Sequence, residues 1–350
     1  MSVATEISRI QQAKADIKSS IEAKGVTVPS AALIDDYSDY VDAIQTGGGG
    51  GNQDLIDLIE GDITTLSIPS GTTKIRTSSF ANISSLTSVT IPNTVTNIEN
   101  NAFTNCTGLT SITLPNEVKF IGENLFNGCT GLTSATIGNQ IVTITGGMFR
   151  GCTSLQSFTV PDSVHYISSY AFYGCTNLAS ITIGSGTKLE SIGQQAFINC
   201  TSLTSFTIPN SVTSIGTSAF YGCTGLTSVT LGSGITQIAQ GAFMNCSNLL
   251  NVTIPNTITN ISGNAFNACT SFTSVTIPSS VTYIGQTAFG GCSSLTSITV
   301  EATTPPTLGS NVFNNTNNCP IYVPAASVDT YKAASGWSSL ASRIQAIPSE

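Results

Sequence analysis

Ten cysteines are the residues of this 350-residue chain whose chemistry first needs an explanation. Zinc sites use closely spaced Cys and His ligands, but the chain has no C-x-x-C pair and its single histidine, His165, lies outside the cysteine pattern. In the first repeat Ile83 takes the cysteine's place, so the position accepts an apolar side chain. We predict buried free thiols and no metal, although stacked repeats would bring neighbouring cysteines within bridging reach, which leaves disulfides open. Nine cysteines share the repeat position: Cys106, Cys129, Cys152, Cys175, Cys200, Cys223, Cys246, Cys269 and Cys292.

Groups that could form a catalytic centre are sparse. His165 lies near Asp162, but no serine stands out as a nucleophile, and other repeats mostly have Thr where His165 stands. The glycine run Gly47–Gly51 has neither the lysine nor the strand–helix context of a phosphate-binding loop. We therefore predict a protein that is not an enzyme, with no catalytic residues and no cofactor. The acids between 63 and 300 stand at unrelated repeat positions: Glu99, Glu117, Glu123, Asp162 and Glu190.

Aromatic and basic side chains gather at positions that vary between repeats. Tyrosine and arginine are enriched at interface hot spots, and tyrosine also stacks on sugars. Ordinary surface drift explains the same variation, so both interpretations stay open. The predicted binding residues belong to four consecutive repeats: Arg150, Tyr166, Tyr170, Tyr173, Ile198 and Tyr221.

The charge distribution argues against nucleic acid as a partner. The net charge is −8, and residues 1–62 hold eleven acids against four bases, which gives −7. Residues 63–300 hold five of each, and residues 301–350 hold three acids against two bases, which adds −1. Binding to phosphates needs clustered Lys and Arg, and the neutral middle of the chain has no such cluster.

The element that must position these residues is a repeat of about 23 residues. Its phenylalanine recurs every 23 residues, with one step of 25 that two extra residues in 184–189 explain. Each repeat has one apolar side that it cannot bury alone, so neighbours must stack into a continuous core. Within a segment such as Ser88–Ile91, Val89 and Ile91 point inward and the hydroxyls outward, which predicts ladders of Ser and Thr. The phenylalanines are Phe80, Phe103, Phe126, Phe149, Phe172, Phe197, Phe220, Phe243, Phe266 and Phe289.

This pattern resembles the BspA-type leucine-rich repeats, which are known from bacterial surface and adhesin-like proteins. The matching motif is A-F-x-x-C-x-x-L-x-S-[IV]-T-I-P-x-x-V-T-x-I-G, as in 219–231 and 288–300. The resemblance implies a leucine-rich-repeat solenoid over 63–300, β-rich with short helical turns and about ten repeats. It also implies a C-terminal cap over 301–350, with a last strand near 319–324 and helices over 328–334 and 337–344.

The first 46 residues predict a small α-helical hairpin. The hairpin resembles a module of structural proteins from gut phages and prophages, so we interpret it as an anchor or oligomerisation unit. Residues 47–62 would follow as a glycine linker and a short capping helix over 54–60. The predicted contact residues lie on the apolar helix faces: Ile7, Ile10, Ile17, Ile21, Leu33, Tyr37, Val41 and Ile44.

These features predict a phage virion protein, a fibre or decoration protein whose repeat surface attaches to the host. The alternative is a bacterial cell-surface or secreted adhesin with leucine-rich repeats. The start of the chain does not resemble a secretion signal and no stretch is long enough to span a membrane, which favours the virion. Expected partners are other virion proteins or copies of the chain, with a homo-oligomer, first of all a trimer, and a host-surface glycan or protein.

Overall fold

The computed structural model describes residues 64–348. The predicted hairpin over 1–46 with its eight contact residues lies outside the described residues, as do the linker and the capping helix predicted over 54–60.

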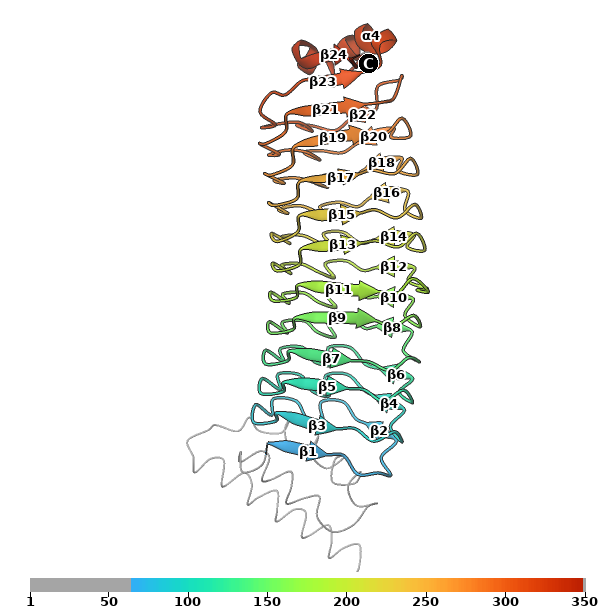
Figure 1. Ribbon diagram of the computed structural model, residues 1–350, viewed down its shortest axis with the longest axis vertical. Coiled ribbons are helices and arrows are strands. Elements are labelled where there is room, and N and C mark those ends of the chain that lie inside the picture. Colours follow the sequence, from blue (N-terminus) through green and yellow to red (C-terminus); the bar gives the residue numbers. More distant parts are fainter. Residues whose placement is uncertain (1–63, 349–350) are drawn as a thin grey trace, which may run out of the picture. The chain divides into compact units, whose positions relative to one another are not determined.

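Residues 64–348 form a parallel β-solenoid in which each repeat is one rung (Figure 1). One side of the stack holds the longer strands, which pair in parallel with the equivalent residues of a neighbouring rung; Phe158, for example, lies opposite Ile181. These strands are β1 (Thr65–Ser67), β3 (Ser88–Thr90), β5 (Ser111–Thr113), β7 (Ser134–Thr136), β9 (Ser157–Val160), β11 (Ser180–Ile183), β13 (Ser205–Thr207), β15 (Ser228–Thr230), β17 (Asn251–Thr253), β19 (Ser274–Ile277), β21 (Ser297–Val300) and β23 (Ile321–Val323).

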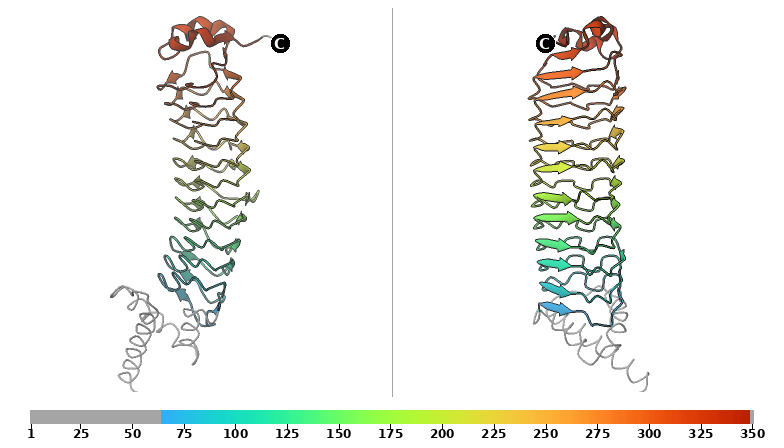
Figure 2. Two further views of the ribbon diagram at one scale, coloured as in Figure 1. Left: turned by 90° about the vertical axis from the view of Figure 1, so that its left-hand side faces the viewer. Right: turned by 45° about the vertical axis from the view of Figure 1, so that its right-hand side comes forward.

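A second column of two-residue strands runs along another side of the same rungs (Figure 2). They also pair in parallel and in register, so Tyr166 lies between Thr143 and Ser191. The register holds across the 25-residue repeat because its two extra residues lie in the loop between β11 and β12. The short strands are β2 (Lys74–Ile75), β4 (Asn97–Ile98), β6 (Phe120–Ile121), β8 (Thr143–Ile144), β10 (Tyr166–Ile167), β12 (Ser191–Ile192), β14 (Ser214–Ile215), β16 (Gln237–Ile238), β18 (Asn260–Ile261), β20 (Tyr283–Ile284) and β22 (Thr307–Leu308).

The predicted alternation places each repeat's apolar side chains in one continuous core. In β3, Val89 is buried between exposed Ser88 and Thr90, and other rungs follow the same pattern. The repeat phenylalanines stack face to face from Phe80 to Phe313, with neighbouring ring centroids 5.1–5.7 Å apart. The solenoid and its Ser/Thr ladders are thus confirmed.

The segment around each phenylalanine forms a succession of tight turns with little helix. The N–H of Thr104 donates to the carbonyl of Asn101 in its own turn, whereas that of Phe103 donates to Leu125 in the next rung. Since the bonds alternate between the two directions, no continuous helix forms. The residues two before and two after each phenylalanine have left-handed backbone, which explains why Asn and Gly recur there.

The repeat cysteines lie in the core and form a ladder of their own. All ten cysteines of the chain are free thiols and buried. Each of the nine repeat thiols donates a hydrogen bond to a phenylalanine carbonyl of the preceding rung, with Sγ–O distances of 3.0–3.2 Å. The prediction of buried free thiols is confirmed, and neighbouring cysteines do not pair as disulfides.

A C-terminal cap covers the last rung. Tyr331 and Trp337 are fully buried, and their polar atoms donate to the carbonyls of Ala302 (2.8 Å) and Pro306 (2.7 Å). The predicted strand near 319–324 is β23, and the helix predicted over 328–334 is confirmed as α4 (Val328–Ala333), preceded by the 3-10 helix η1 (Ala325–Ser327). The second predicted helix is a 3-10 helix, η2 (Ser338–Arg343). It leads into an unpredicted strand, β24 (Ile344–Ala346), that pairs with β23.

No helix within 64–348 has both the length and the apolar character needed to cross a membrane.

Candidate binding site

Three of the predicted binding residues form one contact group, which we call the tyrosine–arginine cluster: Arg150, Tyr170 and Tyr173. The guanidinium carbon of Arg150 lies 5.1 Å from the ring centroid of Tyr173 and 5.9 Å from that of Tyr170. The two ring centroids are 6.2 Å apart. Arg150 and Tyr173 hold the same repeat position in adjacent rungs, and the parallel register stacks them. A cation over two aromatic faces is an arrangement that both positions the cation and keeps it at the surface.

Tyr170 stands in strained backbone. It lies two residues before Phe172, at the left-handed position, with φ +62°. Most rungs place Asn, Gly or Ser there, because a bulky side chain in this conformation costs about 1–2 kcal/mol. Tyr170 is nevertheless 36% exposed, so it stands outside the buried core. Strain held at an exposed residue that stability does not require points to a functional role.

Tyr166 belongs to a second, separate group. Its hydroxyl donates to one oxygen of Glu190 (3.1 Å), and Nδ1 of His165 lies 2.8 Å from the other oxygen. The contact with His165, and then that with Tyr166, lowers the pKa of the Glu190 carboxyl; the same hydrogen bond raises the pKa of Tyr166. The partner of His165 is therefore Glu190 in the next rung and not Asp162. Both carboxylate oxygens of Glu190 are thus engaged by neighbouring side chains, so the three residues form one hydrogen-bonded group.

Like Tyr166, the predicted binding residues Ile198 and Tyr221 do not join the cluster. Ile198 was expected at an exposed position but is buried, with only 9% of its surface exposed, so that expectation is wrong. Tyr221 lies two rungs beyond Tyr173, and its hydroxyl accepts a hydrogen bond from Asn245 (2.9 Å). The structure thus brings Arg150, Tyr170 and Tyr173 together and leaves Tyr221 apart.

Two features of this surface were not predicted from the sequence. Phe120, in the short strand β6, is 54% exposed. Only its position in the repeat distinguishes it from the buried phenylalanines. The pairing of Glu190 with His165 could have been found, since the two residues hold the same position in adjacent repeats. Register alone places them side by side.

Burial governs the chemistry of the repeat thiols. Within 64–348 no group of three or more His, Cys, Asp or Glu side chains could hold a metal ion. Burial raises the pKa of Cys106, Cys223 and Cys292 to about 12 and that of the other repeat cysteines well above the usual value. Thiols that stay protonated and enclosed are poor nucleophiles and poor ligands.

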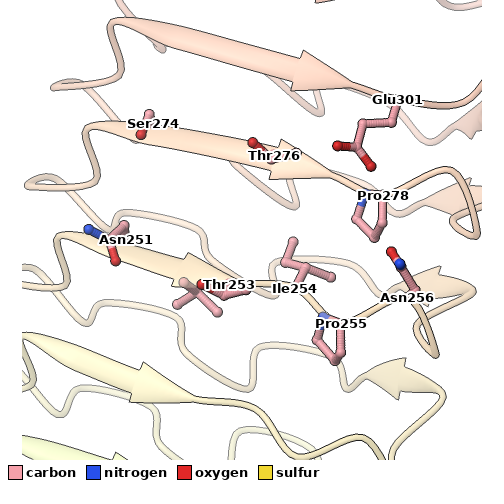
Figure 3. A pocket seen from close by; sticks show the side chains of 10 residues that line it. Asn251, Thr253, Ile254, Pro255, Asn256, Ser274, Thr276, Pro278 and Glu301 are labelled. Carbon is pink, nitrogen blue, oxygen red and sulfur yellow. The ribbon is translucent and has the colours of Figure 1, made fainter.

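A shallow hollow of about 520 Å³ opens on the longer strands near β17 and β19. Figure 3 shows Glu301 and Asn256 on either side of Pro278, with Thr276 beside them. Glu301 stands where other repeats have Pro or Gly, and it brings a charge to a face that is otherwise hydroxylated. The hollow offers hydrogen-bonding groups and a single carboxylate, without an aromatic or cationic side chain. Its chemistry differs from that of the tyrosine–arginine cluster.

Comparison with known proteins bears on the fold and the family. The family model for the BspA type leucine rich repeat region matches six copies, over residues 60–179 and 190–320, and its gap falls at the two-residue insertion. A leucine-rich repeat protein from Bacteroides ovatus is 25% identical, with a TM-score of 0.58 over 83% of this chain and 85% of that one. The pneumococcal vaccine antigen PcpA is 18% identical, with a TM-score of 0.52 over 81% and 77%, and shares the fold. No curated protein matches the sequence.

Proposed function

The chain belongs to the BspA-type leucine-rich repeat family, and from that premise we propose that it is a non-enzymatic binding scaffold at a bacterial surface. The scaffold is cell-bound or secreted and adheres to a host-surface ligand through the tyrosine–arginine cluster. The family resemblance supports this location, since such repeats are known from surface and adhesin-like proteins.

One observation carries the assignment of the contact site: Tyr170 is held in strained backbone at the surface, over an arginine. The Phe, Cys and aliphatic columns are buried in every rung and serve the fold. The cluster lies outside these columns, and its residue types are those of interface hot spots.

Binding of the purified chain to a panel of host-surface glycoproteins and polysaccharides, measured by biolayer interferometry, tests this function. Tyr173→Ala should weaken binding at least tenfold, since loss of a hot-spot aromatic costs about 2 kcal/mol or more. Tyr221→Ala is the matched control and should bind as the parent does, because Tyr221 lies two rungs away. Equal binding by the parent and Tyr173→Ala would show that the contact surface lies elsewhere.

The virion function remains a second candidate because residues 1–46 resemble phage structural modules. A host-attachment role suits both locations, so the cluster does not separate them. Antibodies against the repeats distinguish the two locations. Labelling of intact bacterial cells supports the surface protein, whereas detection in purified phage particles and not on cells supports the virion protein. Size measurement of the 1–350 chain adds the oligomeric state, for which a trimer stays the first expectation.

A further inference from the structure

We propose that the ligand of the tyrosine–arginine cluster is a saccharide that bears a carboxylate, an acidic sugar such as a uronic or sialic acid at the end of a glycan. The proposal rests on the binding function above and adds the chemical class of the ligand. It follows from the state of the Arg150 side chain, from the shape of the aromatic pair, and from the charges around them.

The guanidinium of Arg150 has no ion pair and no side-chain hydrogen bond with any residue of 64–348; what holds it is the two rings. By contrast, Lys74 in the same solenoid is paired with Glu99. A guanidinium keeps its charge at every physiological pH and carries five N–H donors in a planar fork. That fork matches the two oxygens of a carboxylate, which it binds in bidentate geometry.

The two tyrosines supply a platform beside the charge. Their ring centroids are 6.2 Å apart and their ring planes are tilted by 53° to each other, so the pair presents an angled aromatic surface. Tyr173 is half-buried and held by its rung, whereas Tyr170 is exposed. A sugar ring offers one face of C–H groups and a rim of hydroxyls. An aromatic surface with phenolic hydroxyls at its edge can take both.

No acid of 64–348 forms an ion pair with Arg150; the carboxylate of Glu123, in the preceding rung, lies beside Gly146. Glu190, in the rung beyond Tyr173, has both carboxylate oxygens engaged by His165 and Tyr166. Between 64 and 300 the described residues hold five acids and five bases, so no strong field of either sign opposes a small anion. A single arginine does not suit a polyanion, whose binding needs many phosphate contacts. One carboxylate attached to a ring fits one arginine beside two tyrosines.

Isothermal titration of the full chain tests the proposal, with a sialyl-terminated and a glucuronate-terminated oligosaccharide as probes. The same oligosaccharides without the acidic sugar are the matched neutral probes. The parent should bind at least one acidic probe at least tenfold more tightly than its neutral counterpart. Arg150→Gln should abolish that preference. Arg150→Lys should keep only part of it, because an ammonium binds as a point charge without the bidentate fork. Circular dichroism shows that the variants are folded.

Equal affinity for acidic and neutral probes, or an undiminished preference in Arg150→Gln, would overturn the proposal. So would tighter binding of an acidic peptide, such as an oligoglutamate, than of either saccharide. These outcomes differ from failure of the proposed function: if Tyr173→Ala loses binding to the glycoprotein panel while the parent ignores carboxylates, the contact site stands and only the ligand class is wrong. If Tyr173→Ala binds the panel as the parent does, the site itself is wrong.

Discussion

The column of buried thiols should make the solenoid unusually sensitive to alkali. Each of the nine repeat cysteines is fully buried, and desolvation raises its pKa above the ordinary 9.0, to about 12 for Cys106, Cys223 and Cys292. The unfolded chain therefore releases thiol protons from about pH 9 upward, while the folded chain keeps them. The stabilisation is fully present below pH 9 and is lost as pH rises toward the folded pKa of about 12.

The magnitude follows from linkage. At pH 10, one unit above the pKa of a thiol in the unfolded chain, each thiol that stays protonated in the folded chain lowers the free energy of unfolding by about 1.4 kcal/mol. Nine such thiols together amount to about 13 kcal/mol, which is comparable with the whole stability of an ordinary domain, about 5–15 kcal/mol. We expect the array to lose most of its stability between pH 8 and pH 10. Tyr331, whose pKa burial also raises, adds a further loss above pH 10.

The assay is urea unfolding followed by far-ultraviolet circular dichroism at pH 7 to 10.5, with the thiols kept reduced. The control is the double variant Cys200→Ala/Cys223→Ala, which retains seven of the nine titrating thiols. Its midpoint starts lower at pH 7 because two side chains are truncated, but it should fall less steeply, with an alkaline loss at pH 10 smaller by about 2.8 kcal/mol. A midpoint that stays flat to pH 10, or equal slopes for the two proteins, would refute the linkage between burial and alkaline stability.

Three further expectations concern the tyrosine–arginine cluster, the phenylalanine column and the thiols. Tyr170→Asn should change the free energy of unfolding by less than about 1 kcal/mol, because relief of the left-handed strain offsets loss of the contact with Arg150. Tyr173→Asn should lower the free energy of unfolding by about 1–2 kcal/mol, because it loses the contact with Arg150 without any such relief. Urea unfolding midpoints measure both changes, and equal losses would contradict the strain argument. Phe220→Ala, which removes a ring stacked 5.1 and 5.4 Å from its neighbours, should cost about 3–5 kcal/mol. The exposed control Phe120→Ala should cost under about 0.5 kcal/mol, and a similar cost for both would mean that the ring column does not carry the core. Ellman's reagent at pH 8 should modify almost no thiol in the native chain and ten in denaturant, because a pKa raised from 9.0 to about 12 lowers the thiolate fraction about a thousandfold. Rapid modification of several thiols in the native chain would show that the cysteine column is accessible to the reagent.

The repeat made the core predictable from sequence. An inward position meets the same neighbours in every rung, so the physical demand on it is the same and the residue type recurs. That is why the phenylalanine and cysteine columns could be assigned, and why Ile83 at a cysteine position already indicated an apolar environment. The register across the 25-residue repeat was predictable for the same reason.

The contact surface was only partly predictable. Positions outside the core vary because their surroundings differ from rung to rung, and the sequence does not say which way a side chain turns. Ile198 is buried, whereas Tyr170, whose backbone position normally selects Asn or Gly, is exposed. In the tail, β23 and α4 were predicted, but β24 was not, because it follows no repeat and pairs with the edge that β23 leaves open.

The direction of the hydrogen bonds has a mechanical consequence. The bonds between rungs, such as that from Phe103 to Leu125, run along the stack and not across it. A force applied to the two ends of the array therefore loads these bonds in an unzipping geometry, one rung after another, and not all together in a shear geometry. Each rung of 23 residues that peels away would release up to about 80 Å of chain. A surface protein that bridges two bodies under flow would thereby yield stepwise, lengthening by one rung at a time while the remaining rungs stay folded.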